Sequence, residues 1–190
     1  MLKNLLIECS ELFNRSDIAN ELKKHSSASE ITDPSLQNDT LRLISFYNYV
    51  TSSLFNNYVE LIVSEQIKTD EKGNVYFSML SELPCKLLRV ENESKSIKFS
   101  IYPNSLKTNL SNTNLKITYR YIPKEARDLN SKLFTSNRSI LNVICYGVVS
   151  EFLASKNLFD ESDFWKNKFL FEAFNLKSKR GRHIKPTFTI

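Results

Sequence analysis

The side chains best suited to nucleophilic or metal chemistry in this 190-residue chain are three cysteines and two histidines. Cys9, Cys85 and Cys145 are far apart in the sequence, while His25 lies in a polar segment and His183 in a basic one. A zinc site usually shows its ligands at short, regular spacings, and a Cys–His pair would need two of these residues to meet through folding alone. We therefore interpret the cysteines as buried free thiols in a reducing compartment.

The glycines and the acidic residues argue against a phosphate, dinucleotide or metal site. Phosphate-binding and dinucleotide-binding loops need clustered glycines, and the three glycines of this chain are isolated from one another: Gly73, Gly147 and Gly181. An acidic group at residues 160–163 is explained by its place at the start of an expected helix, where the dipole favours negative charge. We expect no catalytic residue, no cofactor and no metal, and therefore no enzyme.

The charge of the chain is concentrated at its C-terminal end. The net charge is +5, and residues 177–190 contain five basic residues and no acidic ones. Residues 1–176 are therefore electroneutral. A partner attracted by charge would meet a short basic arm and not a basic face.

The same arm carries the candidate binding residues. Pro186 excludes a helix, so we expect the arm to be extended. The apolar residues near its end suit docking on a sheet edge or in a groove of a partner. The alternative is that the arm folds back on its own domain or has no fixed structure. The candidate contacts are Lys179, Arg180, Arg182, Ile184, Lys185 and Phe188.

A nucleic-acid-binding module that uses the basic tail is the alternative function. Tyr102, Tyr119 and Tyr121 alternate on expected strands, as stacking platforms for single strands require. The electroneutral body lacks the positive charge that should accompany them, so we interpret them as cross-strand packing residues.

Residues 135–176 predict two helices joined by a tight turn, around which the rest of the chain is organised. Six apolar residues repeat at helical spacing over residues 136–154: Ile140, Leu141, Val143, Ile144, Val148 and Phe152. Gly147 interrupts this helix and suggests a close helix crossing, since glycine costs about 1 kcal/mol there relative to alanine. Asp160 is expected to cap the second helix, whose inner side is expected to hold five aromatic residues: Phe164, Trp165, Phe169, Phe171 and Phe174.

The N-terminal third also reads as helical. Residues 1–13 predict a short amphipathic helix and no signal peptide, and Ser16 or Asp17 is expected to cap a second helix that ends at residues 22–24. Residues 25–39 are polar and broken by Pro34, which predicts a loop. Residues 40–61 predict a long helix, held by packing because its helix propensity is low.

The periodicity changes to that of strands over residues 62–122. Residues 62–69 and 74–77, joined by a turn at 70–73, predict a hairpin. Further strands are expected at residues 85–90, 97–102 and 115–121, with apolar side chains alternating with polar ones. Residues 125–134 predict a loop that leads back to the helices.

These elements predict an α+β fold in which an antiparallel β region is inserted into a helical base. We expect a single domain over residues 1–176, made of helices at 1–61, the β insertion at 62–122 and the helical hairpin at 135–176. The basic extended tail follows at 177–190. No apolar run approaches the roughly 20 residues that a membrane-spanning helix requires, so a membrane is not an expected partner.

Three segments resemble a known family. Residues 144–152 (Ile-Cys-Tyr-Gly-Val-Val-Ser-Glu-Phe) and residues 160–169 (Asp-Glu-Ser-Asp-Phe-Trp-Lys-Asn-Lys-Phe) are similar to the C-terminal hairpin of small head–tail connector proteins of tailed bacteriophages. Residues 117–123 (Ile-Thr-Tyr-Arg-Tyr-Ile-Pro) match a strand motif of the same family. The order of the elements agrees along most of the chain.

The resemblance implies a connector, adaptor or head-completion protein. Such proteins form a homo-oligomeric ring, usually of about twelve copies, under the portal protein, and a closed ring needs head-to-tail interfaces. The ring would extend the channel through which the genomic double-stranded DNA passes, without sequence-specific binding. It would also offer a platform to the next neck or tail protein. The basic tail would dock on the portal or on a neighbouring subunit. The implied location is the neck of the virion, after synthesis in the host cytoplasm.

Overall fold

The computed structural model describes residues 1–178 and divides them into two compact units. Among the described residues, the helical unit consists of Met1–Val59 and residues 124–178, and the β unit consists of Glu60–Pro123. This arrangement is the expected α+β fold, with an antiparallel β region inserted between N-terminal helices and a C-terminal helical hairpin. Within residues 1–178, no helix is long and apolar enough to cross a membrane. The expected basic tail, apart from its first two residues, lies outside the described residues.

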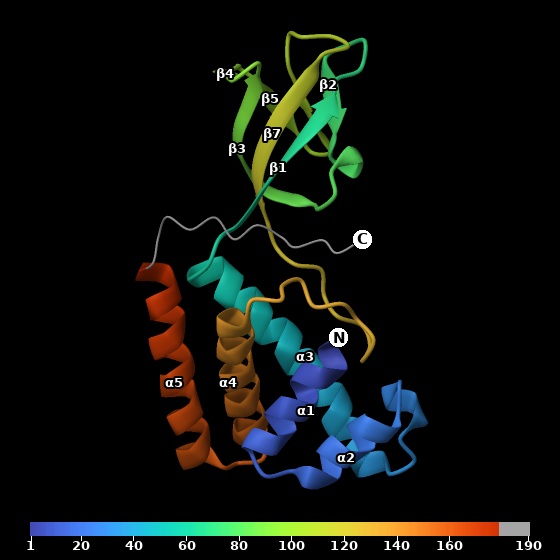
Figure 1. The fold of residues 1–190 in the computed structure, drawn as a ribbon, viewed down its shortest axis with the longest axis vertical. Helices are drawn as coiled ribbons and strands as arrows, with labels where there is room; N and C mark the ends of the chain where they lie inside the picture. Colours follow the sequence, from blue (N-terminus) through green and yellow to red (C-terminus); the bar gives the residue numbers. More distant parts are fainter. Residues whose placement is uncertain (179–190) are drawn as a thin grey trace. The chain divides into compact units, whose positions relative to one another are not determined.

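The two short N-terminal helices form where they were expected. Helix α1 runs over Leu2–Leu12 and α2 over Ser16–Lys24 (Figure 1). The expected cap of α2 is wrong, because the helix begins at Ser16 itself, after Arg15, and no side chain caps it. Asp17 instead accepts hydrogen bonds from the Arg15 guanidinium, at 2.8 Å from Nε and from Nη2.

Helix α3 begins earlier than its hydrophobic periodicity indicates. It runs over Pro34–Asn57, preceded by a short 3-10 helix at Ala28–Glu30. Asp33 caps α3 by accepting hydrogen bonds from the backbone N–H groups of Ser35 and Leu36, and a proline is well tolerated in the first helical turn. The expected loop over residues 25–39 is therefore wrong in its second half. The helix also ends before Leu61, which belongs to the first strand.

Helix α4, over Arg138–Ser155, is the centre of the helical unit. It packs against α1, α3 and α5 (Figure 1), and all six apolar residues that define its predicted stripe are buried. Asn137 caps it through the backbone N–H of Ser139. The turn to α5 uses Asn157 in the left-handed region, with φ 62°. Helix α5 runs over Phe159–Ser178, so Asp160 lies inside its first turn and is not its cap.

A buried carboxylate ties three helices of the unit together. Asp39 on α3 is an ion-pair partner of Lys156 at the end of α4, at 2.7 Å, and of Arg15 before α2, at 3.3 Å. The irregular segment over residues 124–137, which the sequence predicts as a loop, is fixed on the same unit. The side chain of Asn48 both donates to the carbonyl of Ala126 and accepts from its N–H.

The β unit contains two antiparallel sheets. One has the strand order β1-β7-β3-β4 and the other β2-β6-β5. The strands are β1 at Leu61–Lys68, β2 at Asn74–Tyr76, β3 at Pro84–Asn92, β4 at Lys95–Ser96, β5 at Ser100–Tyr102, β6 at Ser105–Lys107 and β7 at Asn114–Tyr121. A short 3-10 helix at Phe77–Met79 follows β2. The largest buried side chains of its core belong to Leu106, Leu115, Ile117 and Tyr119.

Most of the strand predictions are right in position, but residues 97–99 of the strand expected at 97–102 lie outside β5. The predicted pairing is partly wrong. Strand β7 has the expected alternation, because Leu115, Ile117, Tyr119 and Tyr121 are all buried. The predicted hairpin of β1 with β2 is wrong: β1 pairs with β7, and β2 pairs with β6. The clean alternation predicted over residues 97–102 is also wrong, because Ile101 is exposed.

Candidate assembly surface on helices α3, α4 and α5

Small residues bring α4 and α5 into close contact. Ser150 on α4 donates a hydrogen bond to the carbonyl oxygen of Ser162 on α5, and Ser162 donates one to the carbonyl oxygen of Ser150, both at 3.0 Å. A Cβ at Gly147 would lie 2.5 Å from Cγ1 of Val50 on α3 and 3.1 Å from Cδ2 of Phe169 on α5. The expected close crossing at Gly147 is therefore confirmed, since three helices meet there without room for a methyl group.

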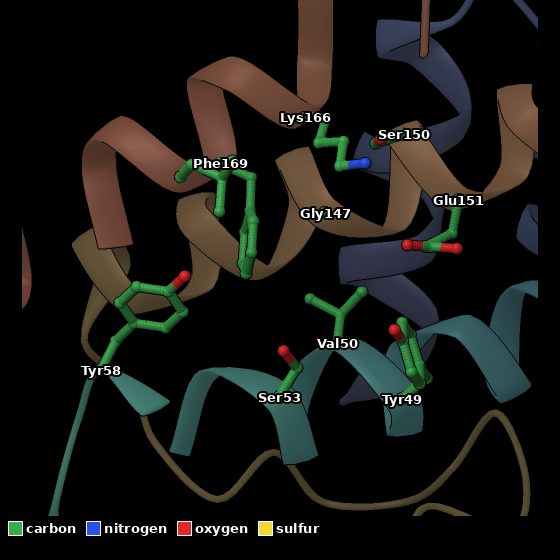
Figure 2. A pocket seen from close by; sticks show the side chains of 10 residues that line it. Tyr49, Val50, Ser53, Tyr58, Gly147, Ser150, Glu151, Lys166 and Phe169 are labelled. Carbon is green, nitrogen blue, oxygen red and sulfur yellow. The ribbon is translucent and has the colours of Figure 1, made fainter. Parts of the chain in front are cut away.

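A groove of about 150 Å³ opens over this crossing, with walls from α3 and α5. Figure 2 shows Val50 and Phe169 directed toward Gly147, with Ser53, Tyr49 and Tyr58 along the α3 side. The residues that line it are Tyr49, Val50, Ser53, Tyr58, Gly147, Ser150, Glu151, Lys166, Phe169 and Leu170. Such a hollow, apolar at its base and polar at its rim, can hold an apolar side chain while its edge remains in water.

The rim of the groove carries charges of both signs. Glu151 comes from α4 and Lys166 from α5 (Figure 2). Two residues further along α5, the Lys168 ammonium lies 4.4 Å from the ring centroid of Tyr146 and 5.1 Å from that of Trp165. These cation–π contacts hold the aromatic rings between α4 and α5 in place. Because Glu151 and Lys166 both line the groove, it has no strong preference for a ligand of either charge.

The outer face of α5 is apolar and exposed. Phe164, Phe171 and Phe174 are 61%, 67% and 65% exposed, whereas Phe169 is 9% exposed. The sequence-based expectation that all of these phenylalanines fill the inner side of the helix is therefore wrong. Residues 169 and 171 lie about 200° apart around an α-helix, so they cannot share one face. We call Phe164, Phe171 and Phe174 the outer stripe of α5.

The residues expected to carry partner contacts belong to the basic tail. Lys179, Arg180, Arg182, Ile184, Lys185 and Phe188 all lie outside the described residues. The groove and the outer stripe are built from other residues, all within the described part of the chain. Sequence reasoning missed both of these surfaces, although two signals were available for them. One is the glycine inside α4, and the other is the distribution of phenylalanines around the whole circumference of α5.

The three cysteines differ in burial. Cys9 and Cys145 are buried against each other, with 2.7 Å between their sulfur atoms, whereas Cys85 is exposed, contrary to the expectation of three buried thiols. Burial raises the pKa of the Cys9 thiol well above its usual value, which keeps it protonated. Within residues 1–178, no group of three or more His, Cys, Asp or Glu side chains is placed to hold a metal ion.

The tyrosines considered as stacking platforms differ in their environments. Tyr119 and Tyr121 are buried in the β unit, and Tyr102 is exposed. The Tyr119 hydroxyl donates to a carboxylate oxygen of Glu65 and accepts from the N–H of Glu82 at 3.2 Å. Burial, with the hydrogen bond to Glu65, raises the pKa of Tyr119 to about 12. Two of the three rings thus serve packing, as the sequence indicates.

No protein-family model matches the chain, and no curated protein sequence matches it.

Proposed function

We propose that this chain is a structural virion protein of the phage neck, which forms a ring below the portal and joins the head to the tail components. The observation that carries the proposal is the outer stripe of α5. A soluble monomer rarely leaves several large aromatic side chains exposed on one helix face, and such a patch usually marks an interaction site. The resemblance of residues 144–152 and 160–169 to the connector hairpin supplies the kind of partner.

The order of the elements supports the same proposal. Helices, an inserted β region and a C-terminal helical hairpin follow one another along the chain as in the connector family that the sequence resembles. In the proposed assembly, copies of the chain contact one another through the helical unit. The β unit exposes further apolar side chains that suit the next neck or tail protein, including Tyr76, Met79, Leu83, Leu88, Ile101 and Tyr102.

The basic tail has a separate role in this proposal. Its residues dock on the portal protein or on a neighbouring copy, while the genomic DNA passes through the ring without sequence-specific contact. No catalytic activity is part of the proposed function. The protein is made in the host cytoplasm and ends in the neck of the virion.

One observation favours a second candidate, a nucleic-acid-binding module. The whole net charge of +5 falls within residues 177–190, as in proteins that bind nucleic acid through a basic arm. Five charges permit only a modest dependence of DNA affinity on salt, because the slope follows the number of phosphates neutralised. The burial of Tyr119 and Tyr121 removes two of the rings that a stacking surface would use.

A binding experiment separates the two candidates. A tagged full-length chain and a chain that ends at Ser178, which keeps the whole of α5, are tested against the portal protein of the same genome and against double-stranded DNA. The connector proposal predicts that the full-length chain binds the portal and that the shorter chain binds it much more weakly. If the full-length chain binds DNA at physiological salt and ignores the portal, the second candidate is right and the first is wrong.

A further inference from the structure

The outer stripe of α5 is large enough to need a partner. Phenylalanine side chains contribute about 200 Å² each when fully exposed, so the three rings leave roughly 400 Å² of apolar surface in water. Phe164, Phe171 and Phe174 follow one another at seven and three residues, with Asn167 between the first two, which places them on one side of the helix. Each of these three residues therefore keeps more than half of its surface exposed in the described part of the chain.

The groove over Gly147 has the size of one aromatic ring. Its volume is about 150 Å³, and a protein cavity of about 150 Å³ with apolar walls is known to accept benzene. Val50 and Phe169 form its apolar base, as Figure 2 shows, and Tyr49 and Tyr58 stand at its α3 side. The exposed aromatic rings of the outer stripe therefore match the groove in size and in chemistry.

The stripe and the groove cannot meet within one copy. Phe169 faces the groove, and Phe171 lies about 200° further around the same rigid helix. Contact between the two surfaces therefore requires a second copy. A two-fold dimer would place the same patch of both copies face to face, whereas a contact between two different patches is heterologous and can be repeated around a ring.

We infer that the outer stripe of α5 on one copy packs into the groove between α3 and α5 of the next copy, with a phenylalanine ring over Gly147. This inference names the subunit contact of the ring and so rests on the proposed function. The stripe supplies about half of the roughly 800 Å² that each partner buries in a standard interface. Isolated copies therefore associate weakly, and they associate more strongly when the portal holds them side by side at high effective concentration.

Cysteine cross-linking tests the contact in the full-length chain. Cys85, which is exposed, is first replaced by serine, and Cys9 and Cys145 stay buried. Ser53→Cys then marks the groove and Phe171→Cys marks the stripe, in separate proteins. The two are mixed and treated with diamide, which takes up two electrons and two protons as each disulfide forms. The experiment is run on the chain alone at high concentration and on its complex with the portal protein.

The expected result is a disulfide-linked dimer in the mixture and none with either variant alone. A chain that carries both substitutions should give a ladder of multimers. Cross-linking of Phe171→Cys with itself would show that stripes pair two-fold, and it would overturn the inference. Absence of any cross-link in a complex that still contains many copies on the portal would overturn the inference and leave the proposed function standing. A cross-link between the two variants in the chain alone, without any binding to the portal, would support the inferred contact and contradict the proposed function.

A matched pair of substitutions provides a second test. Phe171→Glu removes an apolar ring from the stripe and is expected to weaken self-association about a hundredfold, because the lost burial involves roughly 130 Å². Phe159→Glu is the control, since Phe159 is 61% exposed on the same helix but lies about 120° from Phe171. It should change the association less than threefold. Equal effects of the two substitutions, with the fold intact by Trp165 fluorescence, would contradict the inference.

Discussion

Replacement of Gly147 by alanine tests the crossing of α3, α4 and α5 on which the groove depends. Two effects oppose each other. Alanine favours the helix by about 1 kcal/mol over glycine. The added methyl group would lie 2.5 Å from Cγ1 and 3.1 Å from Cγ2 of Val50, and 3.1 Å from Phe169.

The steric effect should exceed the gain in helix propensity. Overpacking of a buried site costs about 1–3 kcal/mol, and the upper end applies here, because Val50 is buried and a β-branched side chain on a helix has one strongly preferred rotamer. We expect Gly147→Ala to lower the free energy of unfolding of the helical unit by about 2 kcal/mol.

A double-mutant cycle with Val50→Ala isolates the cause. Val50→Ala removes both methyl groups that the new Cβ would meet. In that background, Gly147→Ala should raise the free energy of unfolding by up to about 1 kcal/mol, because the propensity gain is then opposed only by the 3.1 Å contact with Phe169. Asn142→Ala, elsewhere on α4, is the control for propensity without a clash, with an expected gain of about 0.5 kcal/mol.

Urea unfolding followed by tryptophan fluorescence measures these changes. The single tryptophan, Trp165, lies on α5 with its ring 5.6 Å from that of Tyr146 on α4, so its signal reports on the helical unit. A separate probe is needed for the β unit, because two compact units need not unfold together. The reasoning is refuted if Gly147→Ala stabilises the wild-type chain, or if its effect is unchanged by Val50→Ala.

Three further measurements test other parts of the structure. Asp39→Ala should lower the free energy of unfolding by about 2 kcal/mol, since it removes a buried partner of two cations, while Asp17→Ala should cost under about 1 kcal/mol; equal costs would contradict the assignment. Ellman's reagent should label Cys85 alone in the native chain and all three thiols in urea, so two or more native equivalents would be contrary evidence. Burial raises the pKa of Tyr47 and of Tyr119 to about 12 from a usual value near 10. Both residues therefore favour folding below pH 10, and this contribution is lost as the pH rises toward 12. In a pH titration, part of the tyrosine phenolate absorbance of the native chain should therefore appear at higher pH than in urea. Coincident titrations of the native and the urea-unfolded chain, with the fold intact, would contradict this.

Helices with one clearly apolar face could be predicted from the sequence. Helix α4 has this pattern, and its stripe is buried as expected. The predicted start of α3 lies too far along the sequence, because the first turn of the helix is polar and because Pro34 suggests a helix breaker. Next to the capping side chain of Asp33, a proline is compatible with the first turn of a helix.

The predictions failed where a partner of an element lies far away in the sequence. The turn at residues 70–73 suggested a local hairpin, but β1 pairs with β7 across more than forty intervening residues. Hydrophobic alternation fixes which face of a strand is buried but does not identify its neighbour. The alternation around Ile101 failed for another reason, since that strand is short and its apolar side chain is exposed.

The groove could be predicted only in part. Gly147 signalled a close approach of helices, and the structure confirms one. The identity of the helices that cross there depends on tertiary packing, which a single sequence does not encode locally. The outer stripe of α5 was assigned to the core because phenylalanine is usually buried. Its members lie far from Phe169 around the helix. This angular position predicts their exposure better than the usual burial of phenylalanine does.

The rotational symmetry of the assembly that contains this chain tests the central claim most directly. The full-length chain is combined with the portal protein of the same genome, and the complex is imaged as single particles. The account predicts a closed ring of about twelve copies coaxial with the portal, with equivalent head-to-tail contacts between neighbours. A complex with one or two copies and no rotational symmetry, or no complex at all, would contradict it.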